Sequence, residues 1–150
     1  MNISLVPISV TDAVGGFQQI VSRFRADSES SVDSCGLGEE GDVIQNLLSH
    51  VYSGEIAEAV VFGKTLLGDD GVGTVCALLS VGEVQEVAEA LGSVSVQEVM
   101  SYAPRYLSGV IRGEIPNGYL EYLEQTVIEV CEIYRFASRE GMCMAQIYEG

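Results

Sequence analysis

The spacing of apolar positions changes several times along the chain, and each change marks a different element. Residues 3–10 are apolar and β-branched, a composition that predicts a strand opening a sheet. Residues 142–148 have the same character and predict a closing strand that joins the sheet of the first one. Between them, the apolar runs at residues 59–62 and 72–79 predict two short buried strands on either side of a glycine-rich turn at residues 68–71.

Other stretches place apolar residues three and four positions apart, which is the repeat of an amphipathic helix. This spacing predicts a first helix over residues 11–24, a second over residues 42–52 and a long one over residues 117–140. A glycine follows soon after both the second and the long helix, where glycine commonly ends a helix. Residues 26–41 are rich in serine, glycine and acidic side chains without any repeat, and predict a mobile acidic loop.

Two further helix starts are marked by a serine followed three residues later by a glutamate. Ser80 with Glu83, and Ser95 with Glu98, have the spacing at which the hydroxyl and the carboxylate each bind a free backbone N–H at the start of a helix. The second of these helices contains Pro104, which predicts a kink or a break because proline cannot continue the helical hydrogen bonds.

Together these elements predict an α+β fold. At 150 residues the chain has the size of one domain, and hydrophobic residues make up 47% of it, enough to form a core. We expect a single domain in which about five helices pack on a small mixed sheet, with a long penultimate helix and a C-terminal strand.

The charge balance limits the partners of this domain. The chain has 22 acidic residues against 7 lysines and arginines, which gives a formal net charge of -15. Nucleic acids and anionic membranes are bound through clustered basic side chains, whereas the basic residues here are scattered, so we expect neither as a partner. The acidity serves either solubility or a surface that binds a basic protein.

The four cysteines indicate a reducing compartment. No two of them stand close together in the sequence, so we expect free thiols rather than a disulfide framework or a structural zinc site. No lysine or arginine precedes the apolar N-terminal stretch, and a proline and an aspartate interrupt it, which argues against a signal peptide or a membrane anchor. We therefore expect a cytoplasmic protein.

No motif in the sequence assembles catalytic, cofactor-binding or metal-binding residues. Residues 63–65 resemble the end of a phosphate-binding loop, but Glu58 stands where that loop needs a glycine. The turn at residues 68–73 lacks the glycine spacing of a nucleotide-binding loop and the ligand spacing of a calcium loop. His50, the single histidine, could act as a base only beside a cysteine such as Cys35, a pairing that depends on the fold. We expect no catalytic residue, metal or cofactor.

Acidic residues and tyrosines are the candidates for a partner-binding surface. Three glutamates fall on one side of the helix after Ser80, two aspartates stand together in the glycine-rich turn, and four tyrosines flank the turn at residues 112–118. Carboxylates attract a basic partner and aromatic rings anchor interfaces, although solvated faces and core packing are the ordinary roles of these residues. As partner-binding residues we select Glu83, Glu86, Glu89, Asp69, Asp70, Tyr119 and Tyr122.

Several segments form a recognisable pattern through their order and local motifs. They are the helix ending Leu-Leu-Ser-His-Val-Tyr-Ser-Gly, residues 57–63, the helix starts at Ser80 and Ser95, and Tyr-Arg-Phe-Ala before Gly141. In these segments, which span most of residues 37–150, the chain resembles the YfbM-like family of bacterial proteins, largely of unknown function. The resemblance implies an α+β fold and supplies no catalytic residues. Similar proteins place a tryptophan and a lysine in the helix at residues 42–52, whereas this chain has no tryptophan.

Two kinds of function follow from these observations. The first is a non-enzymatic protein-binding domain whose acidic surface meets a basic partner, such as an immunity protein that covers the cationic substrate site of a toxin encoded nearby. Binding of this kind weakens as salt is added. The alternative is a small-molecule-binding domain or an enzyme of unknown reaction, with a pocket that only the tertiary structure forms.

Overall fold

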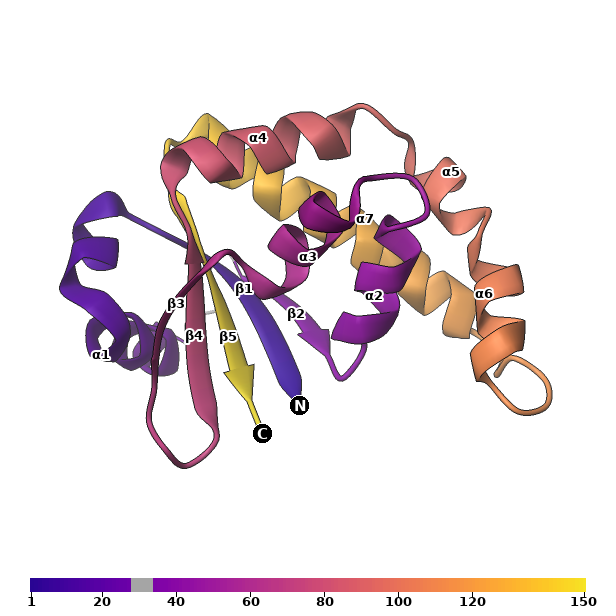
Figure 1. Cartoon of the computed structure of the whole chain (residues 1–150), viewed down its shortest axis with the longest axis horizontal. Helices are drawn as coiled ribbons and strands as arrows, with labels where there is room; N and C mark the ends of the chain where they lie inside the picture. Colours follow the sequence, from indigo (N-terminus) through magenta and orange to yellow (C-terminus); the bar gives the residue numbers. More distant parts are fainter. Residues whose placement is uncertain (28–33) are drawn as a thin grey trace.

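The computed structural model of the chain describes residues 1–27 and 34–150. Within these residues five strands and seven helices follow one another (Figure 1). The strands are β1 (Asn2–Ile8), β2 (Cys35–Gly38), β3 (Thr65–Asp69), β4 (Thr74–Leu79) and β5 (Cys143–Glu149). The helices are α1 (Val10–Asp27), α2 (Gly41–Leu48), α3 (Gly54–Phe62), α4 (Val81–Gly92), α5 (Val96–Met100), α6 (Ala103–Val110) and α7 (Tyr119–Arg139).

The strands form one sheet in the order β2-β1-β5-β4-β3. Every neighbouring pair is antiparallel, so the expected mixed sheet is antiparallel throughout. The C-terminal strand pairs with the N-terminal one along its whole length, from Asn2 opposite Glu149 to Ile8 opposite Cys143. The prediction that the closing strand joins the sheet of the first is thus confirmed, and both chain ends lie side by side (Figure 1).

The sheet separates two layers of unequal size. Alternate residues of β5 point to opposite faces, so Met144 packs into the large core with α2 to α7, while Ala145 and Ile147 pack into a smaller cluster with α1. Figure 1 shows α1 alone on its side of the strands and the other helices gathered on the opposite side. The α+β domain with a long penultimate helix and a C-terminal strand is therefore confirmed.

Residues 59–62 form the end of a helix, not a strand. Ser53 caps the start of α3 by accepting a hydrogen bond from the Ile56 N–H at 3.2 Å, and Gly63 ends the helix with a φ of 75°. A short apolar run fits a buried helix as well as a buried strand, and here the two flanking caps decide the outcome. The strand that precedes β4 in the chain and pairs with it is β3, which begins only after this glycine.

The segment expected to be a mobile acidic loop contains ordered structure. Helix α1 extends to Asp27, and β2 at Cys35–Gly38 adds an edge strand to β1. Cys35 and Leu37 are buried in the main core, and their burial stabilises this strand. The serine- and glycine-rich composition of the segment gave no indication of it. Residues 28–33 of the expected loop lie outside the described residues.

The helices follow the predicted apolar spacing with local differences. Gly16 has a φ of 83° inside α1, and this break turns Val14 out to 83% exposure although its spacing placed it on the buried stripe. The expected second helix ends at Leu48, four residues early, in a tight turn. The break expected near Pro104 separates α5 from α6, and this proline lies in the first turn of α6, where its missing N–H costs nothing.

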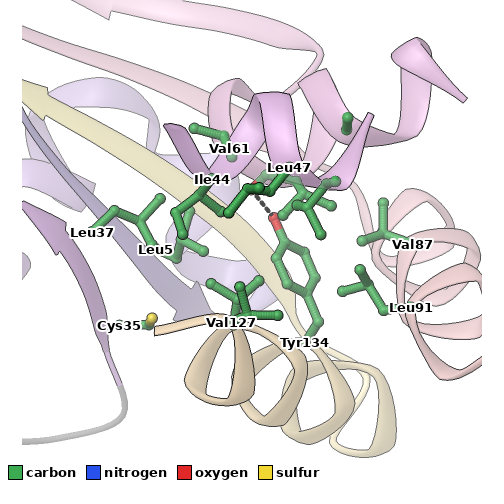
Figure 2. Packing of buried hydrophobic residues seen from close by; sticks show 14 of the residues in the cluster. Leu5, Cys35, Leu37, Ile44, Leu47, Val61, Val87, Leu91, Val127 and Tyr134 are labelled. Atoms are coloured by element: carbon green, nitrogen blue, oxygen red, sulfur yellow. Dashed lines mark hydrogen bonds between the residues drawn. The ribbon is translucent and has the colours of Figure 1, made fainter. Parts of the chain in front are cut away.

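A buried polar network joins α3, α7 and β5 within the main core. The Tyr134 hydroxyl, fully buried on α7, donates to the Val60 carbonyl at 2.6 Å and accepts from Gln146 Nε2 at 3.3 Å. Figure 2 shows its hydroxyl pointing into α3 among the core residues. The Tyr148 hydroxyl donates to the Phe62 carbonyl. These tyrosines satisfy carbonyls at the C-terminal end of α3, which would otherwise be buried without a partner.

Candidate functional site

The selected glutamates lie on the outer side of α4, but one of them has a structural role. The Glu83 carboxylate accepts the Ser80 N–H at 2.8 Å, and the Ser80 hydroxyl accepts the Glu83 N–H at 3.3 Å, which completes the predicted capping box. Glu86 and Glu89 are exposed on the following turns. Of the three, Glu86 and Glu89 are therefore the carboxylates that α4 offers to a partner.

The two selected aspartates organise the turn between β3 and β4. Asp69 Oδ1 accepts the Gly71 N–H at 2.6 Å, and Asp70 Oδ1 accepts the Val72 and Thr74 N–H groups at 2.9 and 3.0 Å. The pKa of Asp70 is lowered first by the Thr74 and Val72 N–H groups, and to a smaller extent by Arg25, whose guanidinium lies 4.0 Å away. Both aspartates thus hold the turn itself, a role the sequence spacing did not distinguish from partner binding.

The two selected tyrosines form a corner with a glutamate that the sequence did not indicate. Tyr119 and Tyr122, in the first turn of α7, have ring centroids 6.5 Å apart and planes tilted by 24°. The Tyr119 hydroxyl donates at 2.5 Å to Oε2 of Glu40, the residue just before α2. Burial, and then this carboxylate, raise the pKa of Tyr119 above its ordinary value. We call Glu40, Tyr119 and Tyr122 the tyrosine corner.

A second aromatic group surrounds the single histidine. The His50 ring lies 5.2 Å from the ring of Tyr102 and 6.1 Å from that of Tyr106, measured between centroids. His50 Nδ1 lies 2.7 Å from the Asn46 carbonyl oxygen, which can only accept, so this nitrogen is the donor of the hydrogen bond. Tyr106 and Tyr119 both pack against the main core, and Figure 1 shows α6 and the start of α7 at the same end of the molecule.

These five rings together form what we call the aromatic surface: His50, Tyr102, Tyr106, Tyr119 and Tyr122. His50, Tyr102 and Tyr122 are exposed, the last two by 38% and 47%. The clustering of the tyrosines around residues 112–118 indicated this surface. The contribution of His50 was missed because it follows α2, more than 50 residues before Tyr102 in the chain.

The selected residues do not converge on one site. The outer side of α4, the β3–β4 turn and the N-terminal end of α7 occupy three separate parts of the molecule, at the top, the lower left and the right of Figure 1. A partner of ordinary size covers about 800 Å² on each side of an interface, so one partner would not contact all three. The tyrosine pair is the part of the selection that lies beside further exposed rings.

One hollow beside Cys35 could hold a small molecule, and the described residues that line it include one thiol and two carboxylates. Its volume is about 430 Å³, and it is lined by Ser34, Cys35, Glu129, Glu132, Ile133 and Phe136. Burial, followed by the charge of Glu129, raises the pKa of the Cys35 thiol to about 12, so the thiol stays protonated and is a poor nucleophile. His50 contacts Asn46 and the two tyrosines instead of this cysteine.

Residues 1–27 and 34–150 contain no group of three or more histidine, cysteine, aspartate or glutamate side chains placed to hold a metal ion. None of the helices in these ranges combines the length and apolarity needed to cross a membrane.

Comparison with known proteins places the chain in a family. Residues 16–147 match the family described as a domain of unknown function, DUF1877. The chain belongs to this family. The crystal structure of YfbM from Escherichia coli, a protein of unknown function, is similar to this DUF1877 domain with a TM-score of 0.65 over 99% of each chain, at 14% sequence identity.

The similarity confirms the predicted YfbM-like fold and extends over the N-terminal third, where the sequence motifs matched weakly. At this level of identity it shows the fold of the DUF1877 domain alone. No curated protein matches the chain.

Proposed function

We propose that this DUF1877 domain is a non-enzymatic protein-binding domain that holds a basic protein against its aromatic surface. Immunity proteins of the bacterial cytoplasm, which neutralise a toxin by covering its cationic site, are the kind of protein it fits. The observation that carries the proposal is the group of exposed rings around His50 and Tyr122 on an acidic domain. Tyrosines that are partly exposed at a surface are frequent anchors of protein interfaces.

The distribution of charge supports a basic partner. Within the described residues the ion pairs use the carboxylates of Asp12, Glu55, Asp70 and Glu140. These four are a small part of the 22 acidic residues of the chain, and the other carboxylates of the described residues form no ion pair with a described lysine or arginine. A negative field of this kind attracts a basic protein over a distance of about 10 Å at ordinary salt and accelerates its association.

The hollow beside Cys35 supports the alternative function, an enzyme, less well than the aromatic surface supports protein binding. Its volume lies within the range of ligand sites, about 300–1,000 Å³. A catalytic pocket brings together a nucleophile or base with groups that tune it, whereas this hollow combines a protonated thiol with two exposed glutamates.

The proposal is tested by binding to basic proteins encoded beside the gene. The full chain is immobilised, and the affinity of each candidate is measured at about 50 and 300 mM NaCl. We expect at least one candidate to bind, with an affinity that falls about tenfold or more at the higher salt as the attraction is screened. No binding by any basic neighbour, or binding that ignores ionic strength, would contradict the proposal.

A matched pair of variants locates the interface. Tyr102→Ser with Tyr122→Ser removes two exposed rings of the aromatic surface, and we expect it to weaken binding by about tenfold or more, as loss of an interface anchor does. Val72→Ser is the control, because Val72 is 86% exposed on the distant β3–β4 turn. Equal affinities for the double variant and the control would place the interface elsewhere.

A further inference from the structure

The tyrosine corner contains one ring that the packing of the domain does not require. Tyr119 has a structural role, because its hydroxyl bonds to Glu40 and ties the start of α7 to the start of α2. Tyr122, one turn of helix later, is 47% exposed. Its hydroxyl lies over Gly38, 3.8 Å from the position a Cβ would take there. Both tyrosines therefore reach the same connection between β2 and α2, but Tyr122 leaves much of its surface to solvent.

The charges around this ring are negative. Glu39, Asp42 and Glu121 are exposed neighbours of Glu40 and Tyr122 in the sequence. No arginine or lysine of the described ranges forms an ion pair with Glu40 or with these three carboxylates. Glu40 Oε2 accepts the Tyr119 hydroxyl, while Oε1 accepts no hydrogen bond from the residues that the structure describes. The corner thus combines an exposed aromatic ring, a carboxylate oxygen held in place by a tyrosine, and an excess of negative charge.

A guanidinium group matches these three features better than an ammonium group. It is planar and stacks on an aromatic ring, it carries several donors in fixed directions for a carboxylate, and it gives up its water more readily than an ammonium ion. A lysine gains from the negative charge but not from the planar fit.

We propose that the tyrosine corner binds an arginine side chain of the basic partner, with the guanidinium on the exposed surface of Tyr122 and its N–H groups donating to Glu40. The inference rests on the proposed function, because it names the part of the partner that this end of the aromatic surface recognises. Tyr119 acts as a positioning residue, since its hydroxyl fixes the Glu40 carboxylate from α7.

The test uses two capped peptides of equal length and charge, one of alternating glycine and arginine and one of alternating glycine and lysine. Their affinities for the full chain are measured by calorimetry in low salt, together with tyrosine fluorescence, which is not masked because the chain has no tryptophan. We expect the arginine peptide to bind about threefold or more tightly than the lysine peptide. Tyr122→Leu keeps an apolar side chain but removes the ring. We expect it to lower the affinity for the arginine peptide about fivefold and to remove most of the preference for arginine over lysine.

Matched controls separate the corner from the general charge of the domain. Glu40→Gln and Glu89→Gln each remove one negative charge, the first in the corner and the second on the exposed side of α4. We expect Glu40→Gln to lower the affinity for the arginine peptide severalfold and Glu89→Gln to change that affinity less than twofold. Val72→Ala, which shortens an exposed apolar side chain on the distant β3–β4 turn, serves as the control for Tyr122→Leu. Thermal unfolding of each variant shows that it is folded.

Three results would overturn the inference: equal affinity for the two peptides, equal loss in Glu40→Gln and Glu89→Gln, or unchanged arginine binding in Tyr122→Leu. These outcomes differ from failure of the proposed function. A basic protein that binds the aromatic surface through Tyr102 and ignores Tyr122→Leu would support the proposed function and contradict this inference. An arginine peptide held at the corner, with no basic protein bound by the chain, would support the corner and contradict the proposed function.

Discussion

At the scale of single residues, the network around Tyr134 depends on a glycine. Gln146 is fully buried, and its Oε1 has no hydrogen-bond partner among the described residues. This oxygen lies 2.4 Å from the position that a Cβ would take on Gly63, so a Cα hydrogen of the glycine points toward it. Gly63 therefore leaves the space that this oxygen occupies, because a Cβ at this position would overlap with it.

Replacement of this glycine tests this packing. Gly63→Ala places a methyl group against Gln146 and Ala77 at a φ of 75°, which alanine adopts only with strain. We expect a loss of about 2 kcal/mol or more in the free energy of unfolding, measured with urea. Gly82→Ala is the control, because nothing lies within 4 Å of its Cβ position in α4. The control should leave stability unchanged or raise it by up to about 1 kcal/mol, because alanine is the better helix former, and a similar loss in both variants would contradict the argument.

The buried thiols make the stability of the domain depend on alkaline pH. Burial raises the pKa of Cys76 to about 11, and that of Cys35 to about 12 with a further contribution from Glu129. In the unfolded chain both thiols ionise near about pH 8.5. Above that pH the unfolded state releases protons that the folded state retains, so stability falls as pH rises from about 8.5 toward 11 and is unaffected below about pH 8.

The slope is measured by urea unfolding at pH 7.5, 9 and 10. Cys76→Ala removes one of the two groups. Between pH 9 and 10 we expect the free energy of unfolding of the variant to fall by about 1 kcal/mol less than that of the natural chain. The comparison is between slopes, because the substitution also changes packing and so lowers stability at every pH. Parallel slopes for the variant and the natural chain would show that Cys76 does not retain its proton.

At the scale of elements, α4 depends on both its cap and its packing. Its apolar side chains Val84, Val87 and Leu91 are buried against the main core, and its first turn has the reciprocal bonds of Ser80 and Glu83. Ser95 caps α5 by accepting the Glu98 N–H at 3.1 Å, but α5 has five residues and one buried side chain, Val99. The two serines therefore stabilise helices of very different importance for the core.

We expect Ser80→Ala to lower the free energy of unfolding by about 1 kcal/mol, because the Glu83 N–H loses the Ser80 hydroxyl that accepts its hydrogen bond. Ser95→Ala should cost less in global unfolding and act mainly through local fraying of α5, visible as faster amide hydrogen exchange there. Ser93→Ala, at the exposed C-terminal end of α4, is the control. A larger global loss from Ser95→Ala than from Ser80→Ala would contradict this ranking.

Elements with local signals were predictable from the sequence, and those defined by distant contacts were not. The capping box at Ser80 located α4, and the three- and four-residue spacing located α7, since both signals are local. Strand β2 has only four residues, two of them glycine, and exists because β1 pairs with it. The run at residues 59–62 fits either a helix or a strand until Ser53 and Gly63 are recognised as the caps of α3.

The candidate site was predictable to a similar degree. Tyr119 and Tyr122 were selected from their place in the sequence, and the structure pairs their rings. Glu40 gave no signal, because it approaches Tyr119 only when α2 packs beside α7, 79 positions away. The aspartates of the β3–β4 turn had a structural role that their sequence position allowed but did not distinguish from binding.

At the scale of the whole molecule, the net charge of -15 acts against the compact state. Folding brings the unpaired carboxylates closer together, and their mutual repulsion is stronger at low salt. We expect the melting temperature at pH 7 to rise by a few degrees, about 2–5 °C, when NaCl is increased from about 10 to 200 mM. A melting temperature that falls with added NaCl would show that favourable ion pairs outweigh this repulsion.

The position of β5 has a consequence for the order of assembly during synthesis. The sheet order places this last strand in the middle, between β1 and β4. Until Cys143–Glu149 has left the ribosome, β1 with β2 and β3 with β4 are two separate strand pairs, because the strand that hydrogen-bonds to both β1 and β4 is missing. Because two-stranded pieces are marginally stable, the nascent chain completes its sheet in a final step that joins residues more than 130 positions apart.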